Sequence, residues 1–107
     1  MFKQLFLGSF ASTLINEKLG ITIEGMNSVS EVADSVAKDY LDLLTAYPEA
    51  FGDASHGFSR LAKRAAESAR QRGAEQVDSE DVETGKRQCG IIFLCIPPDK
   101  NYSIVEI

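Results

Sequence analysis

The sequence predicts an α+β domain in which a bundle of three or four helices is followed by a C-terminal β-hairpin. Apolar residues recur at three- and four-residue intervals as far as about residue 86, which indicates amphipathic helices. Beyond Gln88 a continuous apolar run begins that contains β-branched and aromatic residues, which is typical of a strand covered on both faces. The length of 107 residues fits a single domain, residues 1–107. No internal repeat appears in the sequence.

The first predicted helix, about residues 2–18, is apolar over an unusually wide arc. Such a helix must be covered on two sides, so we expect it to be central to the fold or shared with a partner. With one lysine and no convincing cleavage site, the segment does not fit a signal peptide, and we expect a cytoplasmic protein. Two adjacent apolar stripes are present: Phe2, Leu5, Phe6, Phe10 and Leu14 form one, and Leu7, Ala11 and Ile15 form the other.

The second predicted helix, about residues 28–47, follows a short extended piece at 21–23. Ser28 and Glu31 fit a capping box at its start. Tyr47 precedes a proline, which disfavours helical geometry at Tyr47 and ends the helix there. Residues 48–57, with two glycines, are expected to form a connector.

A third helix is predicted at about 55–72 and a fourth at about 79–86. Alanines on the inner face of the third helix would let a neighbouring helix approach closely. Gly73 suits the left-handed position that ends many helices. Asp78 or Ser79 is expected to cap the fourth helix.

Two strands, about 90–96 and 102–107, form the predicted hairpin around Pro97 and Pro98. A two-stranded hairpin is only marginally stable, so it must pack on the helices or complete a sheet with another chain. In one extended strand Cys89 and Cys95 would lie about 20 Å apart, so an intrachain disulfide is not expected. The candidate oligomer interface consists of the apolar residues of this hairpin: Ile91, Phe93, Ile96, Ile104, Val105 and Ile107.

Charge is distributed unevenly along the chain. The net charge is −5, yet residues 57–73 hold five basic residues and one acidic residue, a local charge of +4. A basic stripe on an acidic body is compatible with an anionic partner, although a solvated helix face is the favoured explanation. The candidate anion-binding residues are Arg60, Lys63, Arg64, Arg70 and Arg72.

Part of this basic segment resembles known families. Residues 58–73 contain a basic helix that ends in Ala-Arg-x-x-Gly, and residues 77–82 read Val-Asp-Ser-Glu-Asp-Val. This pattern is similar to the small helical domain at the C-terminus of the B subunit of light-independent protochlorophyllide reductase and to histone-like folds. The resemblance covers about a quarter of the chain, and the apolar C-terminal segment fits neither family. It implies a small helical module that serves a larger assembly or meets an anion, and no functional residue is carried over.

Other chemistry has little support in the sequence. Glu49, Asp53 and His56 have the spacing of metal ligands on one helix, but the proline and glycines around them interrupt that helix, and no metal site is predicted. Cys89, close to two basic residues, is the more reactive of the two cysteines. No nucleotide-binding loop, zinc motif or nucleophile elbow is present, so no catalytic residue and no cofactor is assigned.

The sequence therefore favours a non-enzymatic protein-interaction or assembly module that forms homo-oligomers and has no membrane-spanning segment. A nucleic-acid or other polyanion binder that uses the basic helix face is the first alternative. The second alternative is a small-molecule pocket lined by aromatic side chains: Tyr40, Tyr47, Phe58 and Phe93.

Overall fold

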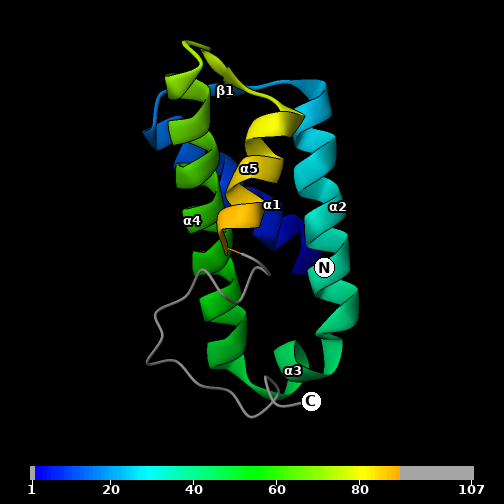
Figure 1. The fold of residues 1–107 in the computed structure, drawn as a ribbon. Helices are drawn as coiled ribbons and strands as arrows, with labels where there is room; N and C mark the ends of the chain where they lie inside the picture. The colour runs from blue at the N-terminus through cyan, green and yellow to red at the C-terminus, as the bar shows by residue number, and fades with distance from the viewer. Residues whose placement is uncertain (1, 90–107) are drawn as a thin grey trace.

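A computed structural model describes residues 2–89, and within them five helices and two short strands follow one another (Figure 1). The helical bundle predicted from the sequence is confirmed. The predicted hairpin, with strands at 90–96 and 102–107, lies outside the described residues. In chain order the elements are α1 (Phe2–Asn16), β1 (Gly20–Ile21), α2 (Ile23–Asp39), α3 (Leu41–Ala46), α4 (Pro48–Gln71), β2 (Gln76–Val77) and α5 (Ser79–Cys89).

The helices enclose one core. Helices α1 and α5 each pack against both α2 and α4, so the two longest helices are bridged from both sides. Figure 1 shows α1 behind this pair and α5 in front of it, with the strands at one end of the bundle and α3 at the other. Helix α1 is thus covered by two neighbours, as its wide apolar arc requires.

Aromatic and small side chains form the contact between α1 and α4. The Phe6 ring stacks on that of Phe58 with 4.8 Å between centroids, and Phe2 and Phe51 extend the cluster. Phe6 and Phe58 are fully buried. Alanines on α4 bring the helices close, as predicted, because they add little width to its inner face. The fully buried alanines of α4 are Ala50, Ala54, Ala62, Ala65, Ala66 and Ala69.

Two predicted helix starts are wrong. Helix α2 begins five residues earlier than expected, because the Thr22 hydroxyl accepts a hydrogen bond from the Gly25 backbone N–H at 2.9 Å and caps it. Ser28 and Glu31 therefore lie inside the helix and form no capping box. Helix α4 begins at Pro48, where proline loses nothing by lacking an N–H, and the predicted connector 48–57 is helical.

The second predicted helix also divides into two. Helix α2 ends at Asp39, Tyr40 takes a non-helical conformation, and α3 continues to Ala46. Tyr47 is extended before Pro48, as expected for a residue that precedes proline.

A structural repeat that is not visible in the sequence organises the fold. In α1–β1–α2 and again in α4–β2–α5, a residue with positive φ lies two positions after the end of the first helix, a two-residue strand follows, and a capped helix begins. The positive-φ residues are Lys18 (61°) and Gly73 (74°). The two strands pair in parallel, Gly20 with Gln76 and Ile21 with Val77, which places the two helix starts side by side.

Candidate functional site

The five basic residues predicted to bind an anion are divided by the structure into two groups. Arg70 donates from Nη2 to the Glu17 backbone oxygen at 2.9 Å and to its Oε1 at 2.7 Å. Arg72 donates to both carboxylate oxygens of Asp81 and lies 3.5 Å from Glu80. These two arginines bind other parts of the same chain, so they do not extend a free basic stripe.

Asp81 is the centre of the network that holds Arg72. Its side chain is fully buried, and it accepts hydrogen bonds from the Ser68 hydroxyl at 2.7 Å and from the Asp78 backbone N–H at 2.9 Å. Burial alone would raise its pKa, but hydrogen bonds from Arg72, the Asp78 N–H and Ser68 outweigh burial and lower the pKa below its ordinary value. The hydrogen bond to Asp81 in turn raises the pKa of Arg72. The sequence indicated only an acidic first helical turn here and missed this role.

The two helix caps are joined to each other. The Thr22 hydroxyl donates to Asp78 Oδ1 at 2.8 Å, and the same oxygen accepts the Ser79 backbone N–H at 2.8 Å. The hydrogen bond from Thr22, followed by that from Ser79, lowers the pKa of Asp78. Asp78 is thus the cap of α5, one of the two residues predicted for this position.

Arg60 and Lys63 have different surroundings from Arg70 and Arg72. Together with His56 they line a polar pocket between α1 and α4, with a volume of about 480 Å³, which we call the α1–α4 pocket. The Nη1 atom of Arg60 is buried and has no hydrogen-bond partner. Arg64 lies on the α5 side of α4, beside Gly85, and does not line this pocket. The remaining lining residues are Thr13, Asn16, Glu17 and Ser59.

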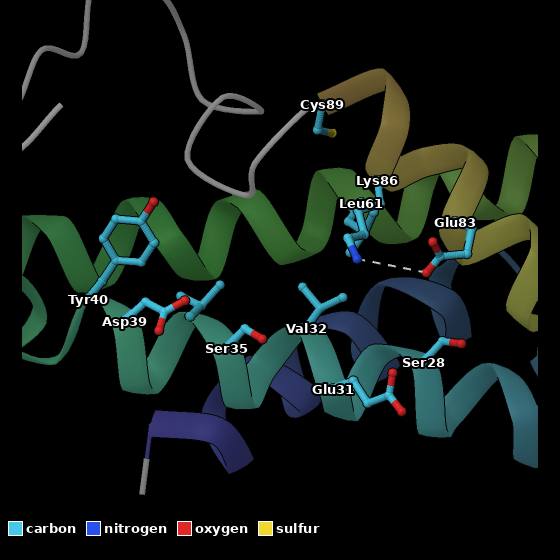
Figure 2. Close-up of a pocket in the computed structure, with 11 residues that line it drawn as sticks. Ser28, Glu31, Val32, Ser35, Asp39, Tyr40, Leu61, Glu83, Lys86 and Cys89 are labelled. Atoms are coloured by element: carbon cyan, nitrogen blue, oxygen red, sulfur yellow. Dashed lines mark ion pairs between the residues drawn. The ribbon is translucent and has the colours of Figure 1, made fainter.

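A second pocket, of about 280 Å³, lies between α2 and α5 over Leu61 of α4 (Figure 2). Its rim is acidic: Glu31 and Asp39 project from α2, and Glu83 from α5 pairs with Lys86 at 3.9 Å. Tyr40 and Cys89 also line this pocket.

Of the aromatic residues predicted to line a small-molecule pocket, the three that the structure describes do not meet in one pocket. Tyr40 lines the pocket between α2 and α5, whereas Phe58 is fully buried in the core. Tyr47 is about half exposed at the start of α4 and lies outside that pocket. Phe93 lies outside the described residues.

The outer face of α1 differs from the outer faces of the other helices because it carries no charge. Leu5 and Ile15 are 50% and 74% exposed on it. A methyl group added to Gly8 on this face would meet nothing within 4 Å, so intrachain packing does not require a glycine there. Lys3, the single charged residue of α1, pairs with Asp34 of α2 at 3.2 Å. The exposed residues of the helix are Gln4, Leu5, Gly8, Ser12, Ile15 and Asn16.

Glu49, Asp53 and His56 do share one helix, because α4 runs without a break through Gly52 and Gly57. The expectation that these glycines interrupt the helix is wrong. Within residues 2–89, however, no group of three or more histidine, cysteine, aspartate or glutamate side chains is arranged to hold a metal ion.

Cys89, at the end of α5, is disulfide-bonded in the structure. The sequence predicted no disulfide, and its second expectation, a reactive Cys89 thiol activated by Lys86 and Arg87, does not apply to a disulfide-bonded cysteine. The six candidate interface residues Ile91, Phe93, Ile96, Ile104, Val105 and Ile107 lie outside the described residues.

None of the helices that the structure describes is both long enough and apolar enough to cross a membrane.

The resemblance of residues 58–82 to the reductase domain and to histone-like folds stays a prediction. No protein-family model, no curated protein and no solved structure matches this chain.

Proposed function

We propose that the protein is a non-enzymatic assembly module that forms a homo-oligomer, and that the outer face of α1 contributes to the interface between copies. One observation carries the proposal: this face exposes Leu5 and Ile15 among uncharged residues. Exposed apolar side chains without a charged surround are typical of an interaction surface. Burying each of them would contribute on the order of 1–2 kcal/mol.

The uncharged surface allows a second copy of the chain to be the partner for this face. The chain has a net charge of −5, so two copies repel each other over most of their surfaces. The outer face of α1 avoids this repulsion, since Lys3 at its edge is paired with Asp34. An uncharged face can be self-complementary, as a two-fold symmetric interface requires.

The spacing on α1 suits an antiparallel pair of α1 helices that cross near the level of Phe10. In such a pair Leu5 of one copy faces Ile15 of the other, and Gly8 faces Ser12. Small residues at the crossing point let two helix backbones approach closely, while the larger side chains pack on either side. This arrangement gives Gly8, which has no packing role among the described residues, a role between chains.

The apolar C-terminal residues remain part of the proposal as a second region of the interface. They are Ile91, Phe93, Ile96, Ile104, Val105 and Ile107. We propose that they associate across the same symmetry axis, as uncovered apolar strands do.

The test is the mass of the full-length protein in solution, measured by light scattering at about 100 μM, where moderately stable dimers persist. The wild-type chain is expected to be a dimer or a larger oligomer. Ile15→Glu should lower the mass to that of a monomer, because it places two carboxylates in an apolar contact. Ile23→Glu is the matched control: Ile23 is 78% exposed but lies at the start of α2, so its substitution should leave the mass unchanged.

Two further variants separate the parts of the proposal. If Ile104→Glu dissociates the oligomer and Ile15→Glu does not, the C-terminal residues form the interface and α1 does not contribute. A wild-type chain that is monomeric at this concentration would show that the proposed function is wrong. Circular dichroism of each variant checks that loss of mass does not reflect unfolding.

A further inference from the structure

We infer that the α1–α4 pocket binds a compact anion, and that its ligand is the phosphate group of a small molecule. The pocket is lined by three basic side chains that can donate hydrogen bonds. His56, Arg60 and Lys63 lie four and three residues apart, which places them on one face of α4. This inference does not depend on the proposed oligomer, because the three basic side chains that carry it lie on α4 and not on the outer face of α1.

Arg60 carries the strongest indication of a ligand. A guanidinium has five N–H donors in a fixed planar fork, which suits two oxygens of a phosphate or carboxylate. The Nη1 atom of Arg60 is buried, yet nothing in the described structure accepts its hydrogen bonds. Buried charged donors are normally paired, so an acceptor that is not part of the chain would complete this environment.

An alternative role for Arg60, stabilisation of the α1 C-terminus, is already filled by other groups. The Leu14 and Ile15 carbonyls accept backbone hydrogen bonds from Leu19 at 3.1 Å and from Lys18 at 3.0 Å. Arg70 binds the Glu17 carbonyl at 2.9 Å. Arg60 is therefore left available for a ligand in the pocket.

The charges around the pocket favour an anion. The single carboxylate that lines it, Glu17, is paired with Arg70 at 2.7 Å, so its charge is largely compensated. The flanking acidic residues of α4, Asp53 and Glu67, are about one turn beyond His56 and Lys63, and neither lines the pocket. Arg60 and Lys63 thus line the pocket beside one carboxylate, Glu17, which is already paired with Arg70.

The arrangement of cations indicates a small ligand and not an extended polyanion. A nucleic-acid backbone needs several cations spread along its length. Two of the five candidates, Arg70 and Arg72, are held in intrachain ion pairs, and Arg64 faces α5. Arg60 and Lys63 converge on one pocket, whose volume of about 480 Å³ is within the range of small-molecule sites.

The experiment is a titration of the full-length protein with inorganic phosphate and with inorganic pyrophosphate, followed by NMR of the backbone amides of residues 13–17 and 56–63. We expect saturable shifts in both segments for the wild-type chain. Arg60→Gln should weaken binding about tenfold or more, because a paired charged hydrogen bond is lost. Arg64→Gln is the matched control, on the same helix but outside the pocket, and should bind as the wild type does.

Each other outcome would overturn the inference. Equal weakening by Arg64→Gln would show that general positive charge attracts the anion. Absence of saturable shifts with either probe would show that Arg60 needs no ligand. Duplex DNA that binds more tightly than pyrophosphate, with equal dependence on Arg60 and Arg64, would favour a polyanion. If Arg60→Gln does not fold, two other variants replace it. Arg60→Lys keeps the charge and loses the planar fork, and Lys63→Gln removes the second cation. Each variant is expected to bind the anion more weakly than the wild type.

Discussion

The two helix–strand–helix halves of the molecule share one backbone plan and stabilise it in different ways. Thr22 caps α2 and Asp78 caps α5, and the parallel strands hold these two caps in contact. Three residues beyond each cap the halves differ, with Gly25 in the first and Asp81 in the second. Equivalent backbone positions therefore have opposite chemical requirements.

The surroundings of each position explain the difference. A Cβ atom at Gly25 would lie 2.7 Å from the backbone oxygen of Val77, so the first half has no room for a side chain there. At the corresponding position in the second half, the Asp81 carboxylate accepts the backbone N–H of Asp78, its own helix cap, and also binds Arg72. Close packing joins the halves at one position, and a buried carboxylate stabilises the turn at the other.

The largest effect is expected for Asp81→Ala, which should lower the free energy of unfolding by about 3 kcal/mol. The reason is that the substitution leaves the Ser68 hydroxyl and the Asp78 N–H without their acceptor. Urea unfolding followed by circular dichroism measures the change. Glu80→Ala removes the exposed neighbouring carboxylate and should change stability by less than about 0.5 kcal/mol. Equal losses for the two variants would contradict the central role of Asp81.

Acid should remove part of the same stabilisation. The folded-state pKa values of Asp78 and Asp81 are lowered from the ordinary 3.8, so the folded protein binds fewer protons than the unfolded chain near that pH. Their contribution to folding stability is complete at pH values above 3.8, and it is lost as the pH falls through the lowered pKa values of the folded state. The stability difference between the wild type and Asp81→Asn should be constant from about pH 7 to pH 5 and shrink below about pH 4. A difference that grows in acid would refute this assignment.

A third prediction concerns packing between the halves. Gly25→Ala should destabilise the protein by about 2 kcal/mol, because the clash with the Val77 carbonyl outweighs the helix propensity that alanine adds. Gly52→Ala is the control, since a Cβ atom at Gly52 meets nothing within 4 Å, and it should be neutral or stabilising. Thermal denaturation of both variants gives the comparison, and a stable Gly25→Ala protein would show that the strand end can move.

The smallest effect is expected at the helix ends. Lys18 has a φ of 61° where the other half has glycine, so Lys18→Gly should stabilise the protein by about 0.5–1 kcal/mol. Gly73→Ala should destabilise it by about 1 kcal/mol, because an alanine must then adopt the left-handed conformation. Thermal denaturation measures the stability of both variants. Stability changes of the same sign in the two variants would show that the two helix ends are not equivalent.

The predictions that held depended on local signals. The stop at Tyr47-Pro48, the left-handed Gly73 and the Asp78 cap each follow from residues that interact within a few positions along the chain. The start of α2 was missed because Thr22 is followed at the third helical position by glycine, so no capping box is visible. Gly52 and Gly57 suggested a break because glycine has a low helix propensity, and the local sequence does not show the packing against α1 that stabilises α4.

The sequence alone determined that helices would form, which residues would end them, and that α1 needs cover on two sides. The tertiary structure decided which of its apolar residues are covered: Phe6, Phe10 and Leu14 are buried, whereas Leu5 and Ile15 face outward. It also decided that Arg72 binds Asp81 while Arg60 faces a pocket. Helix signals depend on residues within about four positions of one another, so they can be recognised in the sequence alone. Burial and ion pairing instead depend on distances between segments as far apart as Thr22 and Asp78, which only the folded chain brings together.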